Sequence, residues 1–572
     1  MPVNRRLPSS ALLLLSLPVI ACAGAAQSAT SAGYASGEPP LKLAPSPTSA
    51  ALTPADLRAR LYIFADDSMQ GRRSGTVGGM KGTAYIASEA RRIGLEPAGD
   101  NGTYFQNLPL YKRTLDPQSD FGVAGARFTP WTDYLPRDQG AGAVPLEGVQ
   151  VIYAGTWGDP ALLPAGRAAG KLVVFSMPLG PDGAPTWSPG RDVATARFRS
   201  AAGIAVASLD AVPATDLADL RQPSLQFGDG DAMPIPSFMY ITLRAASALT
   251  GALLEGLDPG ATGRTVQGGF HFFNSPTDAP ARNVVAILRG SDPSLRGEYV
   301  AIGAHNDHEG MLPEGLDHDS LRAFNEVFRP GGANSAVGAP TPEKSARVQA
   351  ILDSLRRRHP ARRDSIMNGA DDDGSGTVTV LEIAEAMANG KEKPRRSVLF
   401  VWHAAEELGL LGSKWYTGHP TVPRDSIVTQ LNIDMVGRGG PADEKNGGPG
   451  YLQLIGSRRL STELGDLVES VNASGKFGER FDYQYDADGH PDNYYCRSDH
   501  YNYARYGILI AFFTTGGHRD YHQITDEPQY IDYDQMARVG RLIMAVALDV
   551  ADLDHRVVVD QPKPDPQAPC KQ

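Results

Sequence analysis

The stretch Tyr299-Val300-Ala301-Ile302-Gly303-Ala304-His305-Asn306-Asp307-His308 decides how the rest of the chain is interpreted. It begins with an apolar run of strand length, and imidazoles and a carboxylate follow at once. In α/β proteins the chemistry lies at the carboxyl ends of the parallel strands. His305 is therefore the first candidate site residue.

Further apolar runs of strand length follow, and helical stretches alternate with them. The runs cover 283–288, 398–402, 428–433, 451–455 and 508–513, and helices are expected over 378–388, 462–471 and 535–550. Continuous apolar strands suit a sheet that helices cover on both faces. The predicted fold class is therefore α/β, with a mixed, largely parallel sheet flanked by helices.

The ends of these elements are rich in imidazoles and carboxylates. Glu406 and Glu407 follow the 398–402 run, Asp434 follows 428–433, and His522 comes after the 508–513 run. An acidic cluster, 371–373, opens the helix that begins at 377. Each signal alone is common on protein surfaces, but their recurrence at successive element ends indicates one shared site. Imidazole and carboxylate groups bind zinc, and two zinc ions can share a bridging carboxylate.

Together with two N-terminal motifs, 64–72 (FADDSMQGR) and 94–100 (GLEPAGD), these strand-end residues resemble a known family. It comprises the bacterial co-catalytic zinc aminopeptidases related to glutamate carboxypeptidase and the transferrin-receptor ectodomain. The similarity covers nearly the whole mature chain, and residues 125–275 are similar to the inserted β-rich protease-associated domain of such proteins.

The resemblance implies two zinc ions per chain and assigns a role to each residue. His305 and Asp434 would bind one ion, Glu407 and His522 the other, and Asp372 would bridge them. Glu406 would be the general base, and Asp307 would orient His305 from behind. Arg497-Ser498-Asp499-His500 also matches a family motif, whose role the sequence does not reveal.

By the same resemblance the chain is expected to be a metallo-exopeptidase, an aminopeptidase, acting on peptides or proteins. A carboxypeptidase or an aminoacyl cyclase of the same fold is the alternative within the enzyme class. From other classes, a non-catalytic receptor-like protein conflicts with the complete set of ligand positions. An EF-hand is suggested by Asp371-x-Asp373-x-Ser375-Gly376 with Glu382, but it leaves the other strand-end residues unexplained.

The composition limits the remaining possibilities. The chain has 572 residues with 54 Lys and Arg against 65 Asp and Glu, a formal net charge of −11, so a nucleic-acid partner is not expected. Three cysteines exclude a disulfide framework and a cysteine zinc cluster, and the pairing of Cys496 with Cys570 is left open. The oligomeric state is not predicted.

The N-terminus has the pattern of an export signal, because Arg5 and Arg6 precede the apolar run 11–23. Val19-Ile20-Ala21-Cys22 resembles a lipobox, which would lipidate Cys22 and anchor the protein in the cell envelope. Plain cleavage, with Cys22 discarded and the protein periplasmic or secreted, is the alternative.

The expected domains are a signal peptide (1–25), a flexible linker (26–50), a catalytic domain (51–124 and 276–556), the insert (125–275) and a Pro-rich tail (557–572). An additional stretch, 311–368, contains a predicted helix over 343–358 and is expected to lie beside the site.

Overall fold

The apolar runs after residue 282 form the central strands of one nine-stranded sheet in the computed structural model. The structure describes residues 40–572, except 138–142, 181–185, 187–190, 214–216, 218–219, 229–234, 336 and 392. The predicted signal peptide, Cys22 and residues 26–39 of the predicted linker lie outside the described residues. Among those described, no helix is long and apolar enough to cross a membrane.

The order of this sheet is β1-β14-β18-β15-β19-β22-β20-β21, and β2 pairs with β14. Strands β18, β15, β19 and β22 run parallel to one another, so their carboxyl ends meet at one edge. The predicted parallel character holds for this block, whereas β14 and β20 flank it in antiparallel orientation. The bounds are β1 (Glu96–Pro97), β2 (Phe105–Asn107), β14 (Arg282–Leu288), β15 (Tyr299–His305), β18 (Ser397–His403), β19 (Ile427–Ile433), β20 (Tyr451–Ile455), β21 (Arg480–Asp482) and β22 (Leu509–Thr514).

Helices cover both faces of the sheet, as its continuously apolar strands require. On one side α2, α8 and α12 contact the strands, with α1 and α10 packed on these helices, and on the other side α9 and α11 do so. Thr53 caps α1, and α2 ends at Gly94, whose φ of 86° is the left-handed conformation that favours glycine. The bounds are α1 (Pro54–Phe64), α2 (Val77–Ile93), α8 (Gly376–Asn389), α9 (Leu411–Gly418), α10 (Thr462–Ser474), α11 (His500–Ala504) and α12 (Tyr533–Asp552).

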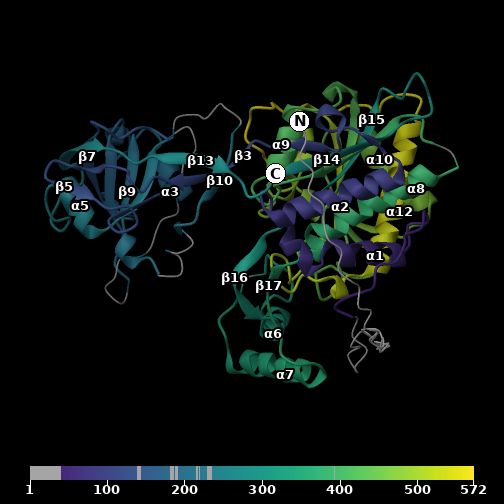
Figure 1. The fold of residues 1–572 in the computed structure, drawn as a ribbon, viewed down its shortest axis with the longest axis horizontal. Coiled ribbons are helices and arrows are strands. Elements are labelled where there is room, and N and C mark those ends of the chain that lie inside the picture. The colour runs from purple at the N-terminus through teal and green to yellow at the C-terminus, as the bar shows by residue number, and fades with distance from the viewer. Residues whose placement is uncertain are drawn as a thin grey trace, which may run out of the picture.

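A separate lobe is inserted between β2 and β14 and lies to one side of the core (Figure 1). Its eight-stranded sheet has the order β5-β4-β12-β7-β8-β9-β11-β6. Because β4 already belongs to this sheet, the lobe begins before the predicted start at residue 125. The bounds are β4 (Phe121–Val123), β5 (Ala126–Phe128), β6 (Tyr134–Arg137), β7 (Gln150–Thr156), β8 (Leu172–Ser176), α3 (Arg191–Arg197), β9 (Gly203–Ala207), β11 (Ser237–Ile241), α5 (Leu243–Thr250) and β12 (Thr262–Gly268).

A three-stranded ribbon joins the lobe to the core. It has the order β10-β3-β13, and Figure 1 shows it between the two bodies. Strand β3 (Leu110–Leu115) leaves the core, β13 (Phe272–Pro276) returns antiparallel to it, and β10 (Ser224–Phe227) comes from the lobe. From β10, Leu225 and Phe227 pack against a small apolar cluster that includes Ala404 and Ala405 of the core.

A second excursion carries the predicted additional stretch. Antiparallel strands β16 (Gly310–Asp317) and β17 (Arg363–Met367) frame α6 (His318–Phe328) and α7 (Pro342–Arg358), as Figure 1 shows below the core. Helix α7 agrees with the helix predicted over 343–358. The excursion leaves the core directly after His308 and returns directly before the acidic cluster at 371–373.

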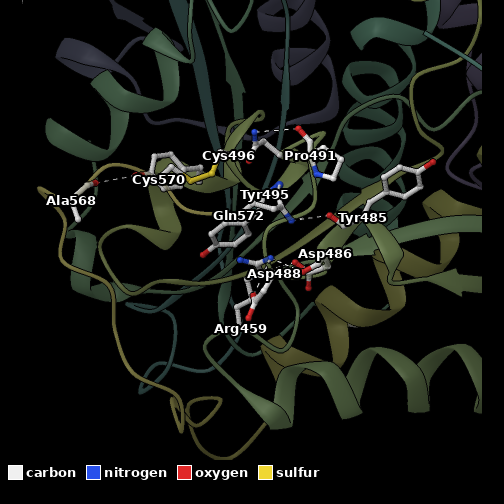
Figure 2. Close-up of a disulfide and its surroundings, with 12 residues drawn as sticks. Arg459, Tyr485, Asp486, Asp488, Pro491, Tyr495, Cys496, Ala568, Cys570 and Gln572 are labelled. Atoms are coloured by element: carbon white, nitrogen blue, oxygen red, sulfur yellow. Dashed lines mark hydrogen bonds and ion pairs between the residues drawn. A yellow bond between two sulfur atoms is a disulfide. The ribbon is translucent and has the colours of Figure 1, made fainter. Parts of the chain in front are cut away.

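Cys496 and Cys570 form a disulfide, which settles the pairing that the sequence left open (Figure 2). The end of the chain is therefore fixed to the core rather than hanging from it. The Gln572 carboxamide also accepts a hydrogen bond from the Tyr495 N–H at 2.9 Å, and Arg505 donates to the Pro566 carbonyl. At the other end of the described chain, the Thr48 hydroxyl donates to Glu385 of α8 at 2.7 Å.

Candidate metal centre

The parallel block brings the sequence-predicted residues together at its carboxyl edge. His305 ends β15, Glu406 and Glu407 follow β18, Asp434 follows β19, and His522 lies in the loop after β22. Asp372 reaches the same place from the loop that precedes α8. The convergence follows from topology, because adjacent parallel strands end at the same edge.

Asp372 lies at the centre of this cluster. Its Oδ1 is 3.1 Å from His305 Nε2, and its Oδ2 is 3.0 Å from His522 Nε2. His305 Nε2 is also 3.6 Å from Asp434 Oδ1, and His522 Nε2 is 3.0 Å from Glu407 Oε2. One carboxylate thus faces two separate imidazole–carboxylate pairs.

The cluster has the donor atoms and the burial of a metal site. Ligand atoms of His308, Asp372, Glu407 and His522 lie within 4.8 Å of one another, and so do those of His305, Asp373 and Asp434. Among the described residues, Asp372 Oδ2, Asp434 Oδ1 and His522 Nε2 are buried without a hydrogen-bond partner. Buried polar atoms normally have partners. Asp372 Oδ2 and His522 Nε2 face each other, and Asp434 Oδ1 faces His305 Nε2, so these unpartnered atoms fit bound cations.

His308 was not among the predicted site residues, yet it lies in the cluster. Its Nδ1 is 2.7 Å from Glu407 Oε1, and its ring meets that of His522 edge to face, with the centroids 5.5 Å apart. Its position three residues after His305, in the same strand-end loop, is a signal that the sequence offered.

The imidazole of His305 is fixed from behind by Asp307. His305 Nδ1 lies 3.1 Å from the Asp307 carbonyl oxygen, which can only accept, so Nδ1 carries the proton and Nε2 faces the cluster. The Asp307 carboxylate is farther from the ring, at 3.8 Å, and accepts the Glu406 N–H at 3.1 Å. The orienting group is thus the main-chain carbonyl, and the carboxylate positions the turn that bears Glu406.

The two other acidic residues of the 371–373 cluster accept backbone N–H groups and so hold the loop. The Asp373 carboxylate accepts the N–H groups of His305 and Met435, at 3.1 and 3.2 Å. Asp371 accepts the Gly437 N–H at 2.7 Å. Asp526 accepts the N–H groups of Asp371 and Asp372, at 3.0 and 3.1 Å. Asp372 is therefore presented by a loop whose other carboxylates are committed to backbone donors.

The structure also argues against the EF-hand alternative. The Glu382 carboxylate, which would complete the calcium loop, is buried against the Arg60 guanidinium of α1. Because Asp371 and Asp373 accept backbone N–H groups, these three carboxylates do not converge on one cation.

A role for the Arg497–His500 motif follows from its contacts. The Ser498 hydroxyl donates to Asp434 Oδ2 at 2.7 Å and accepts from the Asn432 carboxamide at 2.9 Å. Asp434 is therefore held with Oδ2 toward Ser498 and Oδ1 toward His305. The Asp499 carboxylate faces His403 Nδ1 at 3.3 Å, inside the core.

A small pocket opens beside the cluster. Its lining combines site carboxylates with aromatic and cationic side chains: His305, Asp372, Glu406, Asp434, Met435, Tyr494, Arg497, Ser498, Phe512, Thr514 and Tyr521. Arg497 donates to the Tyr521 hydroxyl at 3.4 Å. The pocket suits a small group with both polar and apolar parts.

The second excursion contacts a residue that lines this pocket. The Ala333 N–H donates to the Gly517 carbonyl at 2.8 Å. The Asn334 carboxamide donates to Asp492 at 3.0 Å and to the Tyr494 hydroxyl at 3.3 Å. The loop after α6 is thus attached to Tyr494, a pocket-lining residue, which agrees with the expectation that this stretch lies beside the site.

The glutamates after β18 differ in their electrostatic surroundings. Burial raises the pKa of Glu406 well above its usual value, and the neighbouring Glu407 carboxylate adds to this effect. Burial acts on Glu407 in the same direction, but hydrogen bonds from His308 and His522 hold its pKa below the usual value. Glu407 is therefore committed to the cluster, whereas Glu406 faces the pocket.

The fold and this cluster define the class of protein. It is an α/β protein with a candidate metal site, built from imidazoles and carboxylates at the ends of parallel strands. Residues 283–547, which contain every residue of the cluster, match the model of peptidase family M28.

Individual relatives are more distant. The chain is 26% identical over 238 residues to the probable leucine aminopeptidase 1 of Trichophyton verrucosum, covering 39% of this chain and 60% of the relative. It is 42% identical over 81 residues to the leupeptin-inactivating enzyme 1 of Streptomyces exfoliatus, covering 14% of this chain and 18% of that enzyme. A zinc aminopeptidase structure from Bacillus subtilis matches 90% of this chain and 99% of its own, with 17% identity and a TM-score of 0.45. The matches span less than two thirds of the length of the Trichophyton and Streptomyces relatives.

Proposed function

We propose that this protein is a metallo-exopeptidase with two zinc ions, an aminopeptidase that releases N-terminal residues from peptides or proteins. The observation that carries the proposal is Asp372, whose two carboxylate oxygens face two separate imidazole–carboxylate pairs. The match of residues 283–547 to the model of peptidase family M28 supports peptide hydrolysis, and the name of the fungal relative supports the amino end of the substrate.

His305 and Asp434 would hold one zinc ion and Glu407 and His522 the other, with Asp372 between them. Bound there, the ions would make a water molecule more acidic and polarise the scissile carbonyl. Glu406 is placed for proton transfer, because it lines the pocket while Glu407 is paired with two imidazoles. Its carboxylate would take the proton of the attacking water and deliver it to the leaving amine.

The positioning groups complete the arrangement. Ser498 would keep one oxygen of Asp434 away from the metal side, so that the other oxygen is presented to it. The Asp307 carbonyl would keep the proton of His305 on Nδ1 and leave Nε2 as the ligand atom. The pocket beside Glu406 would receive the N-terminal residue of the substrate, with Phe512 on its apolar side.

We also propose that the protein is exported, as a lipoprotein anchored through Cys22 or as a periplasmic or secreted enzyme. The basic start and apolar run of the first residues support this, and so does the Cys496–Cys570 disulfide, since disulfides form and persist in oxidising compartments. Cys22→Ala, expressed in a bacterial host, distinguishes the forms. Transfer from the membrane to the soluble fraction would support the anchor, and identical partitioning of wild type and variant would contradict it.

The experiment for the activity combines metal analysis with a substrate panel. Leucine p-nitroanilide, a free leucyl peptide and its N-acetylated form are assayed before and after removal of metal with a chelator and reloading with zinc. We expect about two zinc ions per chain, zinc-dependent cleavage of the free substrates, and no cleavage of the acetylated peptide. Release of C-terminal residues from the acetylated peptide would make the enzyme a carboxypeptidase, and failure to bind zinc would refute the proposal.

Glu406→Gln is the matched variant in this experiment, because it keeps the size and polarity of the side chain but removes the proton acceptor. Loss of a general base typically costs about 10²- to 10⁴-fold in rate. Zinc content should stay at the wild-type value. Full activity of this variant would refute the assignment of Glu406.

A further inference from the structure

The loop that carries His522, residues 515–530, follows β22 and lies against the second excursion. His522 itself has a φ of 55°, in the left-handed region. A residue with a side chain stays in that region only where the surrounding structure holds it there. Metal-binding imidazoles also depend on neighbouring groups for their orientation. The contacts that hold the His522 loop therefore bear directly on the candidate metal centre.

Helix α6 of the excursion contacts the loop before and after His522 in the chain. The Asn325 carboxamide donates to Asp520 Oδ1 at 3.3 Å and to the Thr525 hydroxyl at 3.4 Å. The Thr525 hydroxyl in turn donates to Asp520 Oδ1 at 2.8 Å. All three side chains are buried. Asn325 thus joins the two ends of the short turn that presents His522.

Glu527 attaches the end of the same loop to the excursion. Its Oε2 lies 3.0 Å from His318 Nε2, and its Oε1 accepts from the Arg362 guanidinium at 2.5 Å. Arg322, also on α6, has its guanidinium 3.5 Å from the centre of the Tyr530 ring. Burial alone would raise the pKa of Glu527, but the hydrogen bond from His318 and the positive charge of Arg362 keep it below its usual value. Glu527 is therefore an ionised carboxylate that donors of the excursion hold in place.

The residue before Glu527 connects these contacts to the bridging carboxylate. Asp526 accepts the N–H groups of Asp371 and Asp372, at 3.0 and 3.1 Å, and is buried. A carboxylate that accepts consecutive main-chain donors fixes the backbone that bears them. The excursion thus reaches both the imidazole of His522 and the loop that presents Asp372.

We propose that the second excursion positions the metal centre: helix α6 holds the His522 loop so that His522 and Asp372 are presented to the metal. Asn325 and His318 are the positioning residues, Asn325 through the turn that bears His522 and His318 through Glu527. This inference rests on the proposed metal site, whose ligands all lie outside the excursion. Helix α6 then sets the affinity of the protein for zinc without contacting the metal.

The first test measures the zinc affinity of Asn325→Ala by competition with a chromophoric chelator. Groups that orient metal ligands typically contribute about 10- to 100-fold to metal affinity. Because Asn325 acts through the turn rather than on the imidazole itself, we expect one of the two zinc ions to bind about tenfold more weakly. Excess zinc should restore leucine p-nitroanilide hydrolysis. Wild-type affinity for both ions in this variant would overturn the role of Asn325.

His318→Phe provides a second, independent variant. Phenylalanine keeps a ring against Tyr530, which stacks on His318 with the centroids 6.3 Å apart, but it cannot donate to Glu527. Because Asp526 holds the backbone of the proposed bridging ligand, this variant should weaken the binding of both ions. Unchanged affinity for both ions would overturn the connection through Glu527.

Gln349→Ala is the matched control in the same excursion. Gln349 lies on α7, where its carboxamide donates to Asp353 of the same helix at 2.7 Å. This variant should bind zinc as the wild type does. A loss of affinity equal to that of Asn325→Ala would show that any change in the excursion weakens the site, which would contradict a positioning role for α6.

Two further measurements separate this inference from a general loss of stability and from the proposed function. The melting temperature of metal-free Asn325→Ala should lie within about 2 °C of the wild-type value, since one hydrogen-bonding side chain is removed from a large domain. A much larger fall, with both ions weakened equally, would overturn the inference. If the wild type binds no zinc, the proposed function fails. If wild type and Asn325→Ala both bind two ions with equal affinity, the positioning role alone fails.

Discussion

The Cys496–Cys570 disulfide provides a prediction whose size follows from the structure. The bond joins residues separated by 74 positions. A disulfide stabilises the folded protein because it restricts the unfolded chain. In the chain-entropy treatment, removing a cross-link that closes a loop of this length lowers the free energy of unfolding by about 4.4 kcal/mol at 25 °C. We therefore expect Cys570→Ser to destabilise the core by an amount of that order, although the buried apolar core itself is untouched.

The expected change in melting temperature follows from the unfolding entropy. At about 2.1 cal/mol/K per residue, a cooperative unit of roughly 400 residues has an unfolding entropy near 0.8 kcal/mol/K. Loss of about 4.4 kcal/mol then lowers Tm by about 5 °C. Calorimetry of the oxidised protein, of the same protein with a reductant, and of Cys570→Ser should give one high and two matching low values.

The experiment is carried out in a Cys22→Ala background, so that no third thiol is present. The double variant Cys496→Ser/Cys570→Ser is the control, because reductant should leave its Tm unchanged. Free thiols titrated in the denatured, unreduced protein would show that the bond does not form. An unchanged Tm in Cys570→Ser, with the bond demonstrated in the parent, would refute the loop-entropy reasoning.

Three further predictions concern a candidate zinc ligand, Glu407, and two residues of the Arg497–His500 motif. Glu407→Gln should lose one of two zinc ions, and mass-spectrometric metal analysis that finds both retained would contradict its role as a ligand. Ser498→Ala removes the donor to Asp434, so zinc affinity should fall about 10- to 100-fold by competition with a chromophoric chelator, whereas unchanged affinity would leave Ser498 without a positioning role. Burial lowers the pKa of the His500 imidazole to about 3 in the folded protein. In the unfolded chain the same imidazole binds a proton below about pH 6.5. The contribution of neutral His500 to the folding stability is therefore fully present above about pH 6.5 and is lost as the pH falls toward 3. His500→Phe should remove about 2 kcal/mol of the destabilisation between pH 6.5 and 5, measured as the difference between urea unfolding curves, and parallel pH profiles would refute this.

The core strands could be predicted from the sequence, because each is a continuous apolar run whose length can be read directly from the chain. The site was predictable for a related reason. In a parallel sheet the residues just after the strands must meet, so the positions of His305, Glu406, Glu407 and Asp434 in the chain already imply their proximity.

Other features depend on contacts between distant segments, which no local pattern encodes. The pairing of Cys496 with Cys570 requires the path of the final residues over the core. Ser498 supports Asp434 only because α11 and β19 are neighbours. His308 contacts Glu407 only because the turn after β18 lies beside the loop after β15.

The antiparallel pairing of β3 and β13 has a consequence for how the molecule folds. The lobe is one continuous stretch of chain, whereas the core is assembled from segments on both sides of it, and α1 packs against α8 and α12. During synthesis the lobe can therefore complete its sheet while the core still lacks its last helix. The ribbon closes the lobe on itself and holds the two ends of the interrupted core side by side. The core thus has to bridge a short gap between strands rather than the full length of the insertion, so a large lobe adds little to the entropy cost of bringing β2 to β14.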